Sequence, residues 1–186
     1  MEKKMKNKYK LIIICAVFTV IISSSLSNYN SFAELNDACV DQSNGNIAIS
    51  YYDSTRSCTK LCVYDLNGNR LFGISFDGGP HVYMQYEESV LWLYISRTNN
   101  LYSLDMSGNI LLEEKNPDLN SEHMKKLREE NWRGWTVNGL TKQTSYEEIN
   151  YIYEVSPFFE RIIGKGSCEL YILSPSGTET MIYQGE

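Results

Sequence analysis

The sequence is poor in residues that commonly carry catalysis, since its 186 residues include only two histidines, His81 and His123. No set of nucleophile, base and orienting residue assembles in the sequence around either histidine. The chain has no Gly-x-Ser-x-Gly motif, and the glycines beside Lys165 lack the frame of a phosphate-binding loop. We therefore predict a protein without catalytic residues, cofactor or bound metal.

Acidic doublets provide one route to an enzymatic alternative. Cleavage of a glycosidic bond needs two carboxyl groups that flank the bond. Most of the doublets fall in expected turns, at strand ends or on an expected helix, where solvated carboxylates are ordinary. An exported glycan-acting hydrolase that uses acidic residues is accordingly the alternative and not the main prediction. The doublets are Glu87-Glu88, Glu113-Glu114, Glu129-Glu130 and Glu147-Glu148.

The N-terminus carries a pattern typical of export, because five lysines within the first ten residues precede an apolar run from Leu11 to Ile22. This run is short for a membrane span unless it continues through residue 26. Ser31 and Ala33 suit cleavage before Glu34, yet their distance from the run also allows an uncleaved anchor in residues 11–26. Both interpretations of residues 1–33, signal peptide or membrane anchor, export residues 34–186, because the lysines stay on the cytoplasmic side.

The exported part is strongly acidic. Removing residues 1–33, which hold five Lys and one Glu, leaves 12 basic and 22 acidic residues and a formal charge of −10. Such a surface is a poor match for nucleic acid or an anionic membrane face. We expect no nucleic-acid partner, and membrane contact only through the N-terminal segment.

Four cysteines remain in residues 34–186, namely Cys39, Cys58, Cys62 and Cys168. An even number in an exported domain allows disulfides. Zinc binding is disfavoured, because the spacing offers no second paired knuckle and no nearby histidine. Disulfides and free buried thiols are both left open.

Residues 34–186 are expected to form one β-rich domain. Short runs of β-branched and aromatic residues alternate with short turns, which predicts antiparallel neighbours in meanders. The first group of strands is expected at 46–52, 60–65, 70–76, 81–86, 90–96, 100–105 and 110–114. After a break, further strands are expected at 133–138, 140–145, 149–155, 161–164, 167–174 and 178–183. Residues 80–115 match one four-stranded unit, and residues 35–76 a shorter neighbour.

The break between the two groups is an expected surface helix over residues 117–131. Asn116 is placed to cap it and Pro117 suits its first position. Its apolar stripe is thin, so we expect it to bridge the hairpins of residues 35–115 and the closing β-region of residues 132–186. A helix that binds a partner is the alternative.

A turn with the pattern Asp-x-x-Gly-Asn recurs along the chain, at residues 65–69 and 105–109. Altered versions lie at 174–178 and 40–52. The aspartate can accept hydrogen bonds from backbone amides two residues on, and the glycine supplies a positive φ. A calcium loop would need glycine and glutamate at other positions. We interpret the repeat as a hairpin turn.

Aromatic residues supply the one hint of a binding surface. Along 91-LWLYI-95, Trp92 and Tyr94 share one face of the expected strand and the aliphatic residues share the other. The aromatic face is expected either to pack against another layer or to bind a ligand. The candidate surface consists of Tyr83, Tyr86, Trp92, Tyr94 and Tyr102.

The units 61-LCVYDLNGNRLFGISF-76 and 101-LYSLDMSGNILLEEK-115 resemble hairpins of bacterial β-propeller repeats of the NHL or quinoprotein type. The overall layout is similar to short, N-terminally anchored bacterial proteins of unknown function. The resemblance implies a mainly β protein with two to three propeller-type blades, too few for a closed ring, preceded by an apolar N-terminal helix. It carries no catalytic residues.

The features together predict a binding or interaction module outside the cytoplasmic membrane, with a protein or glycan partner. The alternatives are the hydrolase described above and a partial propeller that self-associates to complete its sheet.

Overall fold

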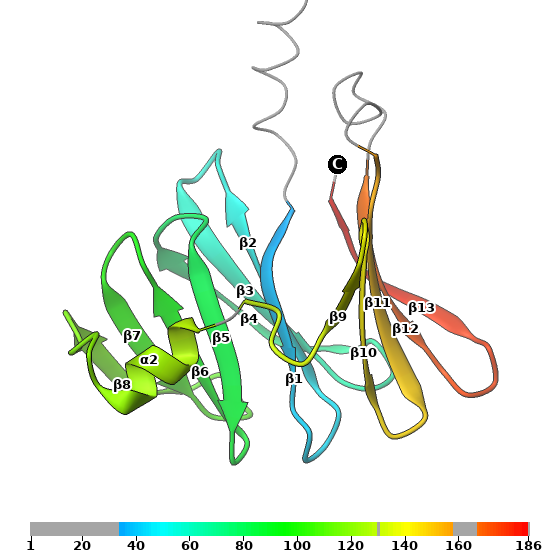
Figure 1. The fold of residues 1–186 in the computed structure, drawn as a ribbon, viewed down its shortest axis with the longest axis horizontal. Helices are drawn as coiled ribbons and strands as arrows, with labels where there is room; N and C mark the ends of the chain where they lie inside the picture. Colours follow the sequence, from blue (N-terminus) through cyan, green and yellow to red (C-terminus); the bar gives the residue numbers. More distant parts are fainter. Residues whose placement is uncertain (1–33, 130, 158–166, 186) are drawn as a thin grey trace, which may run out of the picture.

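A computed structural model describes residues 34–129, 131–157 and 167–185, and within them the fold is mainly β with one short helix (Figure 1). The strands form three antiparallel sheets and no closed barrel. Sheet A has the order β1-β2-β3-β4, sheet B the order β5-β6-β7-β8, and sheet C the order β13-β12-β11-β10-β9. Consecutive strands are neighbours throughout, so each sheet is a meander, as the short turns predicted.

The bounds of the strands follow the expected segments closely. Sheet A contains β1 (Leu35–Val40), β2 (Ile47–Asp53), β3 (Cys58–Tyr64) and β4 (Arg70–Asp77). Sheet B contains β5 (Val82–Glu87), β6 (Val90–Ile95), β7 (Asn100–Leu104) and β8 (Ile110–Lys115). Sheet C contains β9 (Thr136–Asn138), β10 (Thr141–Tyr146), β11 (Ile149–Val155), β12 (Cys168–Leu173) and β13 (Glu179–Gly185). The expected strand at 161–164 lies outside the described residues.

Strand β1 was not expected from the sequence, and it corrects the interpretation of residues 35–76 as a shorter unit. The segment 35-LNDACV-40 contains two polar residues that would normally face water. Asp37 and the rest of β1 are instead largely buried, because this strand lies between the other two sheets. Sheet A is therefore a complete four-stranded unit like sheet B.

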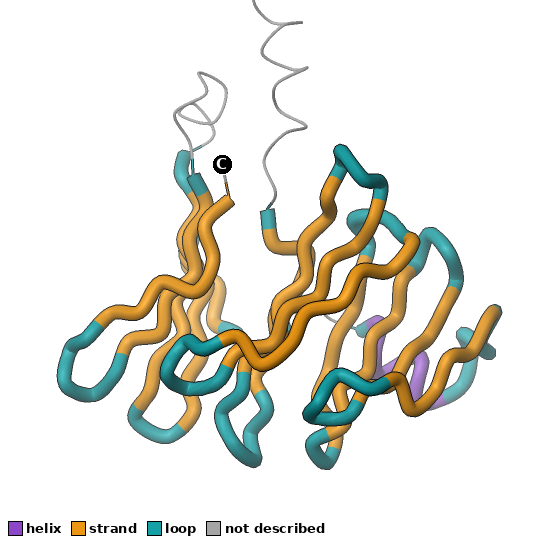
Figure 2. The backbone as a smooth tube through the Cα atoms, turned by 180° about the vertical axis from the view of Figure 1, so that it is seen from behind, coloured by secondary structure: helices purple, strands orange, loops and turns teal. Residues whose placement is uncertain are grey.

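The three sheets stack face to face with sheet A in the middle (Figures 1 and 2). One core joins sheets A and B and includes Leu61, Val63, Leu93 and Leu104. The other core joins sheets A and C and is rich in aromatic rings, which include Trp132, Trp135, Tyr151 and Tyr153. The side chain of Lys142 enters this second core, where its Nζ lies 3.8 Å from the centroid of the Trp132 ring. Burial lowers the pKa of Lys142, and the carboxylate of Asp37 opposes that shift.

The outer side of sheet B is covered by helix α2 (Glu122–Arg128). Its buried residues Met124 and Leu127 pack against Tyr94 and Leu101 of the sheet. The helix is shorter than the expected segment 117–131, and Ser121 rather than Asn116 caps it, accepting a hydrogen bond from Met124 N. Asn116 does not cap this helix, and its Oδ1 instead accepts a hydrogen bond from Asn99 Nδ2 at 3.0 Å.

The recurrent turn is a hairpin turn, as predicted. Its copies at 65–69, 105–109 and 174–178 join the last two strands of sheets A, B and C, respectively. In the first copy Asp65 Oδ1 accepts hydrogen bonds from the amides of Asn67 and Asn69, at 2.9 and 2.8 Å. Asp105 makes the same two bonds in the second copy. Hydrogen bonds from Asn109 are the main reason why the pKa of the Asp105 carboxyl lies below its usual value.

The glycines of the first two turns are also points of close contact between sheets. A Cβ on Gly108, in the turn of sheet B, would lie 2.7 Å from the Phe72 ring of sheet A. A Cβ on Gly68, in the turn of sheet A, would lie 2.6 Å from Thr180 Cγ2 of sheet C. Each turn therefore packs on the last strand of the next sheet in the stack, and glycine is required for space as well as for its positive φ.

We expect Gly68→Ala to destabilise the protein by about 2–4 kcal/mol, because a Cβ there combines an unfavourable left-handed backbone with overpacking between two sheets. Gly134→Ala is the matched control, since Gly134 has a similar φ of 78° and no atom within 4 Å of its Cβ position. The control should lose about 1–2 kcal/mol. Urea unfolding of both variants measures the difference, and equal losses would show that the contact between sheets contributes little.

A buried carboxylate connects the middle of the stack. Asp37 Oδ1 accepts hydrogen bonds from Ala38 N at 2.9 Å and from Trp132 N at 2.6 Å. Its Oδ2 accepts one from Met84 N at 2.8 Å. The side chain therefore ties β1 to β5 of sheet B and to the segment that leads into sheet C. Burial raises the pKa of Asp37 to about 7, and the three amides oppose that rise.

None of the four cysteines in the described residues forms a disulfide, and all are buried. Of the two possibilities left open by the sequence, the structure shows buried thiols. Cys39 lies in the core between sheets A and B, and Cys62 and Cys168 lie in the core between sheets A and C. Burial raises the pKa of Cys39 and of Cys62.

The predicted signal peptide or anchor of residues 1–33, with its apolar helix, lies outside the described residues. Within the described ranges, no helix has the length and apolar character needed to span a membrane.

Candidate binding surface

The candidate site is the face of sheet C that points away from sheet A, here called the outer face of sheet C. Side chains alternate along each strand, so the residues between the buried Tyr151, Tyr153, Leu170 and Ile172 point outward. Cross-strand pairing places Ile152 beside Tyr171, and Tyr171 beside Met181. The face consists of Ile152, Glu154, Glu169, Tyr171, Leu173, Glu179, Met181 and Gln184.

The outer face of sheet C contributes no side chain to the cores of the described residues. Sheet A is packed on both sides, and the outer side of sheet B is covered by α2. Met181 remains 49% exposed, although it is flanked by apolar neighbours. An apolar strip on a sheet face that no described residue covers is typical of an interaction surface.

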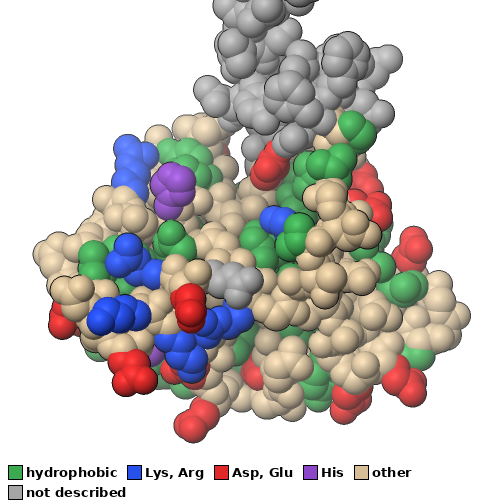
Figure 3. All heavy atoms as spheres, in the orientation of Figure 1, with side chains coloured by type: hydrophobic (Ala, Val, Ile, Leu, Met, Phe, Trp, Pro, Cys, Tyr) green, Lys and Arg blue, Asp and Glu red, His purple; other side chains and the backbone are tan. Residues whose placement is uncertain are grey.

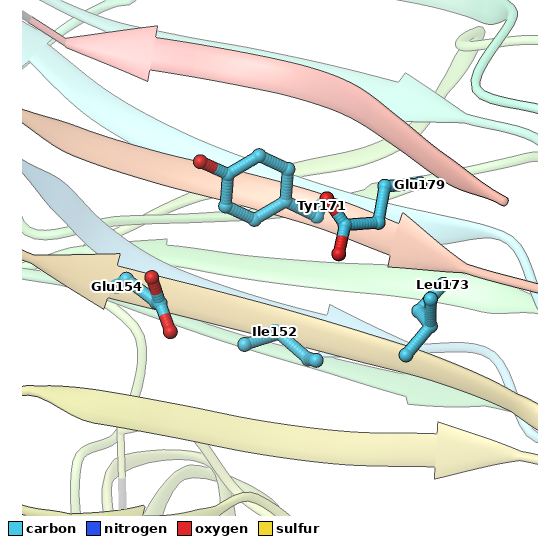
Figure 4. Close-up of a pocket in the computed structure, with 5 residues that line it drawn as sticks. All are labelled: Ile152, Glu154, Tyr171, Leu173 and Glu179. Atoms are coloured by element: carbon cyan, nitrogen blue, oxygen red, sulfur yellow. The ribbon is translucent and has the colours of Figure 1, made fainter. Parts of the chain in front are cut away.

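A shallow hollow of about 150 Å³ lies on this face, lined by Ile152, Glu154, Tyr171, Leu173 and Glu179. Figure 4 shows that the two carboxylates come from β11 and β13, with the Tyr171 ring on β12 between those strands. The lining combines apolar side chains with charged groups that are all acidic. The hollow therefore suits an apolar side chain that is accompanied by positive charge.

Polar contacts hold part of this face in place. Tyr171 Oη donates to Glu169 Oε2, and Gln184 Nε2 donates to Glu169 Oε1 at 3.2 Å. The hydrogen bond to Glu169, followed by burial, raises the pKa of Tyr171 to about 12. Tyr171 is thus a neutral donor at physiological pH, and its ring stays fixed across the hollow.

The aromatic residues proposed from the sequence do not form one surface. Tyr83, Trp92 and Tyr94 lie on the α2 side of sheet B, whereas Tyr86 and Tyr102 lie on the side that faces sheet A. Tyr94 and Tyr102 are only 2% and 6% exposed. The aromatic face is therefore mostly a packing layer under a helix. Any ligand contact by the half-buried Tyr83, Tyr86 and Trp92 stays a prediction.

The acidic doublets are dispersed over the fold. Glu87 bonds to Lys126 Nζ at 2.9 Å, and Glu129 bonds to Arg133 at 3.0 Å. The 113–114 and 147–148 doublets are exposed on β8 and in the β10–β11 turn, and residue 130 is not described. No group of three His, Cys, Asp or Glu side chains in the described ranges could hold a metal ion.

A second hollow, of about 200 Å³, opens where the three sheets converge, beside Tyr86, Gln85 and Arg133. The guanidinium group of Arg133 already has protein partners. It donates to Gln85 Oε1 at 2.9 Å, to Lys126 O at 3.0 Å and to Glu129. The Nε1 of Trp135, which also lines the hollow, is buried without a hydrogen-bond partner. Compared with the outer face of sheet C, this hollow has less free polar functionality to offer a ligand.

The outer face of sheet C was not predicted from the sequence, although its signal was present. The segments 150-NYIYE-154 and 169-ELYIL-173 alternate in the manner of a strand with one face buried. Both faces of β11 and β12 carry aromatic or aliphatic residues. Their order in the sequence therefore does not reveal which face meets sheet A and which remains open.

The comparisons with known proteins add little to the fold. No family model matches the chain, and no curated protein matches it. Among solved structures, the chain is similar to the crystal structure of Kluyvelomyces marxianus Hsv2, with a TM-score of 0.32 and 6% sequence identity. The match covers 82% of this chain and 65% of that one, so the chain spans less than two thirds of its length.

Proposed function

We propose that the protein is a non-catalytic interaction module that binds a protein partner through the outer face of sheet C. The observation that carries the proposal is that this face, unlike the other sheet faces, contributes to no core of the described residues. In the proposed architecture the sheets act as three propeller-type blades, and the open face is where a fourth would pack. The basic and apolar start of the chain supports a location outside the cytoplasmic membrane.

Site-specific photo-crosslinking in the organism's own cells tests this proposal. A photoreactive residue is placed at Tyr171 and, as a control, at Tyr52, a half-buried tyrosine near the end of β2. We expect adducts to form from position 171 and not from position 52, because only the first lies on the outer face of sheet C. A full-length protein that gives no adduct from position 171 would end the proposal.

The hydrolase alternative is supported by one observation, the two carboxylates of Glu154 and Glu179 in a single hollow. A pair of carboxyl groups flanking a sugar is what glycosidic cleavage needs. The hollow is open and shallow, which favours binding over catalysis. Release of reducing sugar from cell-wall glycans by wild type, and its loss in Glu154→Gln, would make the alternative the better description.

A further inference from the structure

The contacts between sheets follow a rule that applies to the two ends of the stack as well. In both cases a turn glycine of one sheet lies against a residue on the last strand of the neighbouring sheet. That residue belongs to the second cross-strand pair counted from its own hairpin turn. Phe72 pairs with Val63 there in sheet A, and Thr180 pairs with Ile172 in sheet C. Phe72 lies against Gly108 of sheet B, and Thr180 lies against Gly68 of sheet A.

In sheet B the same position belongs to Leu112, which pairs with Ser103. The neighbours Tyr102 and Leu104 face sheet A, so Leu112 faces away from it, toward the place of a preceding sheet. Leu112 is 40% exposed, and every residue of β8 is exposed. No turn of the described residues fills this place.

At the sheet C end of the stack, it is the turn glycine, Gly177, that lies against no other sheet of the described residues. Gly177 has a φ of 82°, close to the 80° of Gly68 and the 82° of Gly108. A Cβ built on Gly177 meets no atom within 4 Å. Among the described residues, one end of the stack is therefore a turn that contacts no strand of another sheet, and the other end is a strand that contacts no such turn.

Charge distinguishes the same two ends. The outer face of sheet C carries Glu154, Glu169 and Glu179 and no lysine or arginine. At the sheet B end, α2 has Lys125 and Arg128 exposed. In Figure 3 the Lys and Arg side chains gather over the half of the molecule that holds α2. Two wholly acidic outer faces of sheet C would repel each other, whereas the sheet B end offers Lys125 and Arg128 to the acidic face, although exposed Glu114 and Glu122 lie beside them.

We propose that two copies of the chain associate head to tail, with the outer face of sheet C of one copy against α2 and β8 of the other. The turn at Gly177 then lies over Leu112 of the second copy, beside α2. A twofold rotation makes both contacts at once. This inference rests on the proposed function and specifies its partner as a second copy.

The test measures the molar mass of the purified full chain by multi-angle light scattering, with the mass of any bound detergent subtracted. We expect a dimer at micromolar concentrations. Leu112→Asp should weaken the dimer about tenfold or more, because it places a charge in an apolar contact. The matched control is Leu71→Asp, since Leu71 is 45% exposed on β4 and lies outside the contact.

Charge reversal tests the orientation. Lys125→Glu with Arg128→Glu should weaken the dimer, and so should Glu154→Lys with Glu179→Lys. An equal mixture of these two variants should restore it, because each contact then joins opposite charges.

Three results would overturn the inference. The first is a monomer at all accessible concentrations. The second is a dimer that tolerates Leu112→Asp, which would place the contact elsewhere. The third is a dimer that is sensitive at Glu154 and Glu179 but not at Lys125 and Arg128, which would indicate that two outer faces meet. Adducts from position 171 to a different protein, with a monomeric chain, would overturn the inference but leave the proposed function intact.

Discussion

Replacing Asp37 by alanine should reduce the free energy of unfolding by about 3 kcal/mol or more at pH 5. The substitution removes the acceptor for three backbone amides, those of Ala38, Met84 and Trp132. A buried donor that is left unsatisfied costs about 1–3 kcal/mol. The three amides belong to sheet A, sheet B and the segment before sheet C, so the loss should loosen the whole stack rather than one hairpin.

Urea unfolding at pH 5 measures this effect. Asp65→Ala is the control, because Asp65 also accepts backbone amides but in an exposed turn, and its loss should be clearly smaller. Asp37→Asn should fall between the two. The Asn carbonyl retains the bonds from Ala38 and Trp132, while its amide group faces the donor of Met84. An unchanged midpoint in Asp37→Ala would show that water replaces the carboxyl group without cost.

The second large effect is a dependence of stability on pH. Burial raises the pKa of Asp37 from 3.8 to about 7 in the folded protein. The folded state therefore holds this proton more tightly than the unfolded state. The stabilisation is fully present below the unfolded pKa and is lost as pH rises through the folded pKa. Between pH 4.5 and 8 we expect the free energy of unfolding to fall by about 3 kcal/mol.

Three carboxylates on the surface do not mask this change. The carboxylates of Asp53, Asp65 and Asp105 have lowered pKa values, so their stabilisation is present across this window and is lost only at lower pH. Lys142, whose charge opposes the shift of Asp37, has a pKa lowered by burial, and Cys39 has one raised by burial.

The measurement is the free energy of unfolding at half-unit steps of pH for wild type and Asp37→Asn. The Asn variant should show a much flatter profile between pH 4.5 and 8, because it has no proton to exchange at this position. A wild-type profile that rises with pH would contradict the raised pKa of Asp37. A slope that survives in the variant would assign the titration to another group.

Predictions from the sequence succeeded for local structure. The turns around Gly68 and Gly108 were identified because the aspartate and glycine requirements lie within five consecutive residues. The strands of sheet B were located because alternation and turn spacing repeat over short distances. The helix was located, but its start was wrong, because Asn116 bonds to Asn99 across a hairpin and is thereby withdrawn from capping.

The candidate site could not be predicted in the same way. The aromatic residues of β6 were plausible as a binding platform until α2 was placed over them. Nothing in residues 90–96 indicates that Met124 and Leu127 will lie there. The outer face of sheet C has fewer aromatic residues and did not stand out, because a face becomes a surface only when no other element covers it.

The amino-acid sequence alone determined the antiparallel meanders, their turn chemistry and the acidic character of residues 34–186, because these depend on neighbours within a few residues. Tertiary structure decided the order of the stack, the burial of Asp37 and the vacancies at Gly177 and Leu112. Those features depend on contacts between residues far apart in the chain. The physical reason is that burial is a property of the packed sheets, and identical local patterns become core or surface according to what lies against them.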